Sequence, residues 1–274
     1  RKSKNPDFWR IVMEDNSLAS FISYLASRGL SENSIKAFSS DIKEYLKFQG
    51  SPIEWLESLK KKELTNKTLA RKRSSLSVYF KFLGLDIELP RIKSEEKLPT
   101  VLTEVEAKAL LEMATKTRNP QRDRLIVELL LKAGLRLSEL LNLKVSDIEE
   151  DHGVTFLKVN QGKGKKDRRI PIVDKQVLKN LRLYTKKIDG DNLLFAISSR
   201  RVQYLIKEIA KKSGITKDVH PHTLRHTSAT LYLKKGVNIE SLRKTLGHSN
   251  LSTTQRYLQL TDFDVAEDLA KVKW

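Results

Sequence analysis

Apolar residues recur at helical spacing through the N-terminal third of the chain. The segments 17–29, 34–50 and 66–84 each place apolar side chains three or four residues apart and end in glycine. Pro52 begins a shorter segment of the same kind between the second and the third. The pattern predicts an all-helical N-terminal domain over residues 1–92.

The last of these helices has two different faces. Its apolar residues lie on one side, and the other side carries the cations Lys67, Arg71, Lys72 and Arg73. A charged face is usually only solvated. The local sequence offers these cations no matching acids, so contact with DNA is an equally good reading of the same face.

The pattern becomes mixed after a short charged linker, residues 93–99. Thr103 and Glu106 have the spacing of a capping box, and Gly134 ends a strongly apolar helix. Two strand-like runs, 153–159 and 168–172, then enclose a glycine-containing turn, which predicts a β-hairpin. We therefore expect a mainly α fold of two domains, with a small antiparallel β-sheet or hairpin in the second domain, residues 100–274.

The charge of the chain favours a polyanionic partner. Its 52 Lys and Arg residues exceed its 34 Asp and Glu residues, which gives a formal charge of +18 spread along the chain. A Lys-rich surface that only maintains solubility is the alternative. The chain has no cysteine, so disulfides and thiolate metal sites are excluded. No apolar run has the length of a membrane span, and we expect a cytoplasmic protein without membrane contact.

Candidate chemistry gathers between residues 220 and 257. His222 and Arg225 are three residues apart, so on a helix both leave the same face. Gly247 is expected to end the next helix and to leave His248 exposed on the turn. Tyr257 follows closely. These groups are suited to attack on a phosphodiester by a phenol without a metal, with His222 as the expected acceptor of the phenolic proton.

Spacing alone leaves several alternatives open. Tyr232 lies seven residues after Arg225, on nearly the same helical face, and is an equally good nucleophile by this criterion. His222 and His226 have a zinc-like spacing, but no glutamate follows the first and no third ligand is evident, so no metal is expected.

Two cations outside this region also stand out. Arg136 lies among leucines, where a guanidinium needs an anionic partner, either Glu139 three residues later or a ligand. Lys163 lies between two glycines at the hairpin tip, where it can approach a phosphate closely. The full phosphate-loop pattern for nucleotides is absent, so no ATP or other cofactor is expected.

Four ordered motifs carry a resemblance to a known family: AGLRLSEL, GKGKKDRRIPI, PHTLRHTSAT and LGHSNLSTTQRY. Together they resemble the tyrosine recombinases, specifically the Xer type and most closely its archaeal members. The resemblance covers residues 100 to about 260 nearly continuously. The helical N-terminal domain is similar to the core-binding domain of that family.

The resemblance implies a role for each motif residue. Tyr257 becomes the nucleophile, which removes Tyr232 from contention. The other implied catalytic residues are the two phosphate-clamping arginines, the hairpin lysine and two histidines: Arg136, Arg225, Lys163, His222 and His248. His220 and His226 fall outside this set and are expected to support the fold.

The implied activity is site-specific recombination of double-stranded DNA. The family cleaves through a 3′-phosphotyrosyl intermediate and exchanges strands through a Holliday junction, as a tetramer on DNA. Chromosome dimer resolution is the expected role, and the tail 261–274 is expected to dock on a neighbouring protomer or to pack on its own chain. A type IB topoisomerase and a non-catalytic architectural DNA-binding protein are the alternatives.

Overall fold

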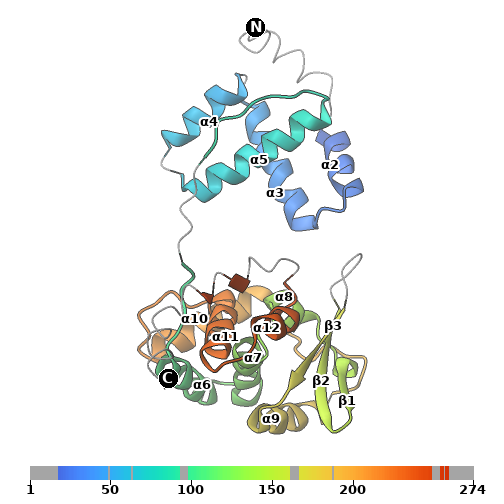
Figure 1. Cartoon of the computed structure of the whole chain (residues 1–274), viewed down its shortest axis with the longest axis vertical. Coiled ribbons are helices and arrows are strands. Elements are labelled where there is room, and N and C mark those ends of the chain that lie inside the picture. The colour runs from blue at the N-terminus through green and yellow to red at the C-terminus, as the bar shows by residue number, and fades with distance from the viewer. Residues whose placement is uncertain are drawn as a thin grey trace, which may run out of the picture. The chain divides into compact units, whose positions relative to one another are not determined.

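The computed structural model describes residues 18–48, 50–62, 64–92, 98–160, 167–186 and 188–248, together with residues 254, 255, 257 and 258. The chain divides into two compact units, Arg1–Lys97 and Leu98–Trp274, shown in Figure 1. Most of the predicted linker, residues 93–97, lies outside the described residues. The predicted fold class, mainly helical with one small antiparallel sheet, is confirmed.

The first unit packs its helices around an aromatic core. Phe21 meets Tyr79 edge to face at 5.1 Å between ring centroids, and Tyr45 lies 5.4 Å from Trp55. Such pairs add about 0.5–1.5 kcal/mol each to the stabilisation from burial. The helices are α2 (Leu18–Ser27), α3 (Glu32–Leu46), α4 (Pro52–Lys60) and α5 (Asn66–Phe82).

The cations of α5 differ from the expectation. Asp41 of α3 accepts a hydrogen bond from Arg71 and another, at 3.1 Å, from the Lys72 ammonium, which is only 7% exposed. Glu44 of α3 also pairs with Lys72 at 2.6 Å, and Arg73 donates to two backbone carbonyls. The idea that this face lacks acidic partners is therefore wrong, because the partners come from another helix that only the tertiary fold brings close.

The second unit surrounds one nearly fully buried helix, α7. This helix makes contacts with α6, α8, α9 and α11, so its apolar residues are buried on all sides rather than along one stripe. Ahead of the sheet lie α6 (Glu104–Met113), η2 (Ala114–Lys116), α7 (Pro120–Lys132), α8 (Leu137–Asn142) and η3 (Val145–Asp147). After the sheet come α9 (Lys175–Thr185), α10 (Ser199–Lys212), α11 (Pro221–Lys234) and α12 (Ile239–Leu246).

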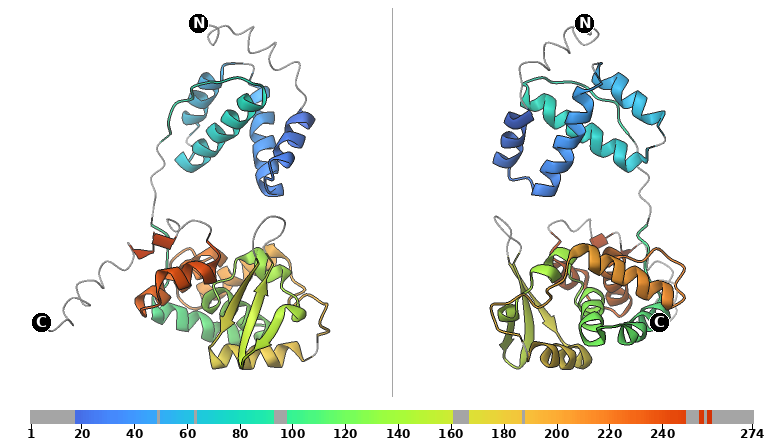
Figure 2. Two further views of the ribbon diagram at one scale, coloured as in Figure 1. Left: turned by 45° about the vertical axis from the view of Figure 1, so that its right-hand side comes forward. Right: turned by 180° about the vertical axis from the view of Figure 1, so that it is seen from behind.

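The sheet is an antiparallel meander in the order β1-β2-β3 at one flank of the second unit (Figure 2). Its strands are β1 (Ile148–Asp151), β2 (Val154–Val159) and β3 (Arg168–Ile172). In β2 every second residue is buried, as expected for a strand with one face on the helices. The predicted hairpin is confirmed as β2 and β3, whereas β1 was missed because its sequence, Ile-Glu-Glu-Asp, has no apolar alternation.

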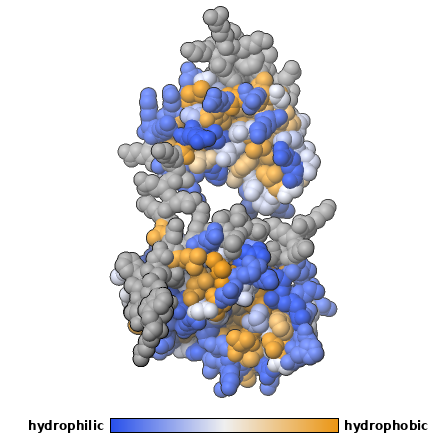
Figure 3. All heavy atoms as spheres, in the orientation of Figure 1, coloured by the Kyte–Doolittle hydropathy of each residue, from blue (hydrophilic) through white to orange (hydrophobic). Residues whose placement is uncertain are grey.

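On the face drawn in Figure 3, each unit shows hydrophilic side chains interspersed with apolar patches. None of the helices in the described part of the chain combines the length and apolar character that crossing a bilayer requires.

Asp41 should hold the first unit together. Replacing it with alanine (Asp41→Ala) leaves the buried Lys72 ammonium without its buried partner, and we expect a loss of about 3–5 kcal/mol in the free energy of unfolding. Urea denaturation followed by tryptophan fluorescence measures the loss. Glu88→Ala, at an exposed position, is the matched control and should change stability by less than about 0.5 kcal/mol. Equal stability of the two variants would contradict the assignment.

Candidate active site

A single buried carboxylate, that of Glu139, gathers three arginines. Arg136 precedes α8 as its N-cap residue, and Glu139 accepts its backbone N–H at 2.7 Å and its Nη1 at 2.6 Å. Arg168, at the start of β3, binds both oxygens of the same carboxylate, at 3.0 and 2.9 Å. Arg225 of α11 places Nη1 3.8 Å from Oε2. One negative charge therefore holds three positive charges in one place.

The C-terminal end of α12 binds the same three guanidinium groups. The last carbonyls of a helix have no partner within the helix and carry its partial negative charge, so cations are stabilised there. Three consecutive backbone carbonyls each accept a hydrogen bond from a different guanidinium. The carbonyl of Thr245 accepts from Arg168 at 2.8 Å, that of Leu246 from Arg225 at 2.5 Å, and that of Gly247 from Arg136 at 3.1 Å.

Gly134 supplies the remaining support of Arg225. Its carbonyl accepts Nη1 of Arg225 at 2.6 Å, and its backbone has a φ of +62°, which favours glycine. A β-carbon at this position would lie 2.7 Å from the Leu246 side chain and 3.2 Å from the Ser228 hydroxyl. The sharp turn after α7 therefore requires glycine at position 134, where the sequence predicted that the helix ends.

Helix α11 carries the H-x-x-R motif and begins with a side-chain cap. His220 Nδ1 accepts the backbone N–H of Thr223 at 3.1 Å, and Pro221 fills the first helical position. In the helix that begins here, Arg225 is only 4% exposed, whereas His222, about one turn earlier, is exposed to solvent. The helix thus reaches from the buried guanidinium cluster to the surface.

Tyr257 lies beside this cluster. It is 3% exposed and packs with Leu242 and Leu246 of α12. Its Oη is 2.8 Å from Nδ1 of His226, and its ring stacks on that of His248 at 6.3 Å and 18°. The phenol therefore contacts His226 of α11 on its hydroxyl and His248 on its ring.

Burial and the nearby cations set the ionisation of the site. Burial and then the charge of Arg136 lower the pKa of Arg225 to about 10, so it remains charged at neutral pH. The pKa of His248 is lowered to about 4, mainly by burial and next by the charge of Arg225. The pKa of His226 is also lowered to about 4, mainly by burial and next by the interaction with His222. Both histidines are neutral at pH 7 and add no charge to the cluster.

The matches to known families cover both units. Residues 100–263 match the Phage integrase family, and residues 18–85 match the Phage integrase N-terminal SAM-like domain. This chain belongs to the phage integrase family. The similarity to tyrosine recombinases that the motifs indicated is confirmed, and with it the enzyme class.

Named relatives include archaeal recombinases of the Xer type. The chain is 39% identical over 259 residues to the tyrosine recombinase XerA of Thermococcus kodakarensis, a match that covers 88% of this chain and 89% of the relative. It is 37% identical over 262 residues to XerA of Pyrococcus furiosus, with 89% of each chain covered.

Solved structures show the same fold. A XerA recombinase crystal structure matches with a TM-score of 0.56 at 29% identity, over 94% of this chain and 98% of that one. A lambda integrase dimer bound to a core site matches with a TM-score of 0.71 at 20% identity, over 88% of this chain and 93% of that one. At the lower identity the likeness concerns the fold alone.

The structure of the recombinase brings together most of the residues that the sequence singled out. Arg136, Arg225, His248 and Tyr257 share one cluster, with His222 on the same helix as Arg225. Lys163 lies outside the described residues. In the described ranges, no three His, Asp or Glu side chains are arranged to hold a metal ion.

The expectation about His248 needs correction. His248 was expected to be exposed on the turn after Gly247, but it is 8% exposed and its Nδ1 lies 2.9 Å from the Thr254 hydroxyl. The Thr254 hydroxyl and the Tyr257 ring both lie against the His248 ring. Tyr232, which spacing alone had left open as a nucleophile, donates its hydroxyl to the Lys132 carbonyl at 2.6 Å.

Sequence reasoning missed Arg168 and underestimated Glu139. Arg168 shares the inward face of β3 with the buried Ile170 and Ile172, and this alternation was a signal that its side chain points inward. Glu139 was considered only as an intrahelical partner of Arg136. Its link to Arg168, 29 residues away along the chain, becomes visible only in the folded structure.

The ionisation of Glu139 should make stability depend on pH. Burial alone would raise its pKa, but the hydrogen bonds and charges of Arg168 and Arg136 lower it to about 2. Because the folded pKa lies below the unfolded value, the stabilisation is complete above about pH 4.5 and is lost as pH falls toward 2. Glu139→Gln should therefore cost about 3 kcal/mol at pH 7 and progressively less below pH 4.5.

Urea denaturation at a series of pH values tests this expectation. Glu112→Gln, at an exposed carboxylate on α6, is the control and should show little difference from the parent recombinase at any pH. A stability gap for Glu139→Gln that stays constant between pH 7 and pH 3 would mean that the charge of Glu139 is not what stabilises the cluster.

Proposed function

We propose that this enzyme is a site-specific DNA recombinase that cleaves and rejoins double-stranded DNA with Tyr257 as the nucleophile. The observation that carries the proposal is the position of Tyr257 next to a cluster of three buried or partly buried guanidinium groups around one carboxylate. The net charge of those four groups is +2, which suits a phosphodiester anion. The DNA-bound integrase with the same fold supports DNA as the partner.

The two proposed phosphate-clamping residues are Arg136 and Arg225. Each keeps its charge at neutral pH and has N–H donors beyond those engaged by backbone carbonyls, since a guanidinium carries five. They would bind the nonbridging oxygens as negative charge develops in the transition state. Positioned donors of this kind contribute about 10²- to 10³-fold to the rate each. His222 and His248 complete the proposed phosphate site.

The proposed reaction conserves the bond energy of the DNA strand. The Tyr257 Oη–phosphorus bond forms while the bond from phosphorus to the 5′ oxygen breaks, which leaves a 3′-phosphotyrosyl link. Lys163 is proposed to protonate the departing 5′ oxygen, because an ammonium is a titratable acid. The 5′ hydroxyl of another strand then reverses the reaction, so neither ATP nor a metal is needed for resealing.

Strand exchange between two duplexes is proposed to pass through a Holliday junction held by a tetramer. The Xer names of the relatives support chromosome dimer resolution as the proposed biological task. The proposed location of the enzyme is accordingly the cytoplasm. A type IB topoisomerase would differ by relaxing supercoils without a defined target sequence.

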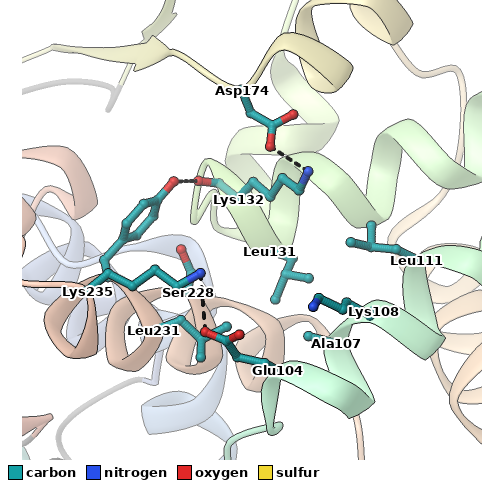
Figure 4. A pocket seen from close by; sticks show the side chains of 11 residues that line it. Glu104, Ala107, Lys108, Leu111, Leu131, Lys132, Asp174, Ser228, Leu231 and Lys235 are labelled. Carbon is teal, nitrogen blue, oxygen red and sulfur yellow. Dashed lines mark hydrogen bonds and ion pairs between the residues drawn. The ribbon is translucent and has the colours of Figure 1, made fainter.

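The proposed tetramer needs contacts between protomers, and the tail 261–274 is the proposed donor. Its sequence combines apolar residues with four acids. The second unit offers a pocket of about 350 Å³ between α6, α7 and α11 (Figure 4). Its apolar floor includes Leu111, Leu131 and Leu231, and Lys108 lies at its side. Two further lysines of the pocket already pair with acids of its lining, Lys132 with Asp174 and Lys235 with Glu104. The apolar floor and Lys108 therefore make this pocket the proposed acceptor for the tail of a second copy.

Replacing the nucleophile should abolish covalent attachment only. Tyr257→Phe keeps the ring but removes the attacking oxygen, so we expect unchanged DNA binding and no phosphotyrosyl product on a nicked suicide substrate carrying the target site. Tyr232→Phe is the matched control, since it removes the phenol that spacing alone left open, and it should trap DNA as the parent enzyme does. Covalent product from Tyr257→Phe would overturn the proposal.

Removal of the tail should weaken assembly of protomers on DNA without weakening the binding of one protomer to DNA. Deletion of residues 261–274 should leave the affinity for a single half-site unchanged and reduce cooperative binding to a full site at least tenfold, measured by gel shift. Lys108→Glu places a negative charge beside the pocket and should weaken cooperativity in the same direction. Lys211→Glu, on the exposed side of α10, is the control with equal change in net charge. Undiminished cooperativity after deletion would exclude the tail.

A further inference from the structure

His226 is the polar side chain that the described structure places against the attacking oxygen. Its Nδ1 lies 2.8 Å from Oη of Tyr257, a hydrogen-bond distance, and the two rings are 5.7 Å apart at 48°. A general base must be within hydrogen-bond reach of the proton that it removes. His226 meets this condition before DNA is bound, although the sequence had suggested only a structural role for it.

The surroundings of His226 fix its protonation. Its own helix contributes the neighbouring Arg225 and His222, the cap of that helix contributes His220, and Tyr257 and the neutral His248 face the same site from the segment after α12. Burial, followed by the charges of His222, Arg225 and His220, lowers the pKa of His226 to about 4. At neutral pH the imidazole is therefore uncharged and one ring nitrogen has a free lone pair.

A neutral imidazole against a phenol has a defined direction of hydrogen bonding. Tyrosine keeps its proton near pH 7, where its reference pKa is about 10. With the imidazole proton on Nε2, the Oη–H group of Tyr257 donates to Nδ1 of His226. The phenolic proton thus points at its acceptor before the reaction begins.

Binding of DNA is expected to make His226 more basic. Besides burial, which is the largest cause, electrostatic interactions with His222 and Arg225 disfavour a positive charge on the imidazole. A phosphodiester between these groups offsets their charge and raises the pKa of the imidazole. The proton acceptor becomes competent when the substrate arrives.

We propose that His226 is a catalytic residue that accepts the phenolic proton of Tyr257 during strand cleavage, the task that the sequence assigned to His222. The proton passes from Oη to Nδ1 as the Oη–phosphorus bond forms and the bond to the 5′ oxygen breaks, and the 5′ oxygen takes its proton from the proposed acid Lys163. On resealing, His226 returns the proton to Oη. This inference depends on the proposed role of Tyr257 as the nucleophile.

The test compares asparagine variants of the two histidines in the full-length enzyme. His226→Asn retains a polar group near the position of Nδ1 but takes no proton in the assay range, and His222→Asn makes the same change one turn earlier. His152→Gln, on the exposed turn between β1 and β2, is the control. DNA affinity, single-turnover formation of covalent product on a nicked suicide substrate, and thermal unfolding are measured for each from pH 6 to pH 9.

We expect His226→Asn to bind DNA like the parent and to cleave it about 10²- to 10⁴-fold more slowly. Its rate should rise about tenfold per pH unit, because hydroxide must replace the missing base, whereas the control keeps the parent profile. His226→Gln is a second variant and should behave in the same way. A role limited to support of the fold would lower thermal stability and DNA affinity without changing the slope against pH.

Three results would overturn the inference: parent-like cleavage by His226→Asn, a loss of DNA affinity equal to the loss of cleavage, or the steep pH slope in His222→Asn instead. Failure of the parent enzyme to form any Tyr257-dependent product would reject the proposed function itself, which the same assay distinguishes.

Discussion

The candidate site depends on how three guanidinium groups are kept together. Arg136, Arg168 and Arg225 repel one another, but each has two partners that keep it in place. One partner is a carbonyl at the end of α12. The other is the Glu139 carboxylate for Arg136 and Arg168, and the Gly134 carbonyl for Arg225. Glu139 contributes one full negative charge and the helix end about half a charge. Roughly one and a half positive charges remain, slightly more than one phosphodiester neutralises.

The same arrangement fixes the position of the nucleophile. Helix α12 ends at Leu246, and its C-cap residue Gly247 has a left-handed conformation. Beyond this turn the ring of His248 stacks on that of Tyr257, whose hydroxyl meets His226 of α11. The carbonyls that bind the arginines and the turn that directs the tyrosine are therefore parts of one helix end. A change in the position of α12 would move the phosphate-binding groups and the phenol together.

Excess cations are handled differently in the two units. In the first unit Lys72 is buried against Asp41 and Glu44, so its charge is neutralised within the fold. In the second unit one carboxylate faces three guanidinium groups. Burial first, and then the nearby positive charges, keep His226 and His248 uncharged at neutral pH. The overall charge of +18 does not distinguish these cases. An anionic ligand is favoured where cationic side chains lack acidic neighbours, and the total number of cationic side chains in the chain does not identify that place.

Periodicity and capping by themselves determined the helices, the β2–β3 hairpin and the residue types of the site, because helix starts, glycine stops and alternating burial are local properties of the chain. The motif resemblance added Tyr257 over Tyr232. Only the tertiary structure decided that Glu139 binds Arg168 and that His226 meets the phenol. These contacts join residues far apart along the chain, and their energy depends on distance and burial, which local patterns do not contain.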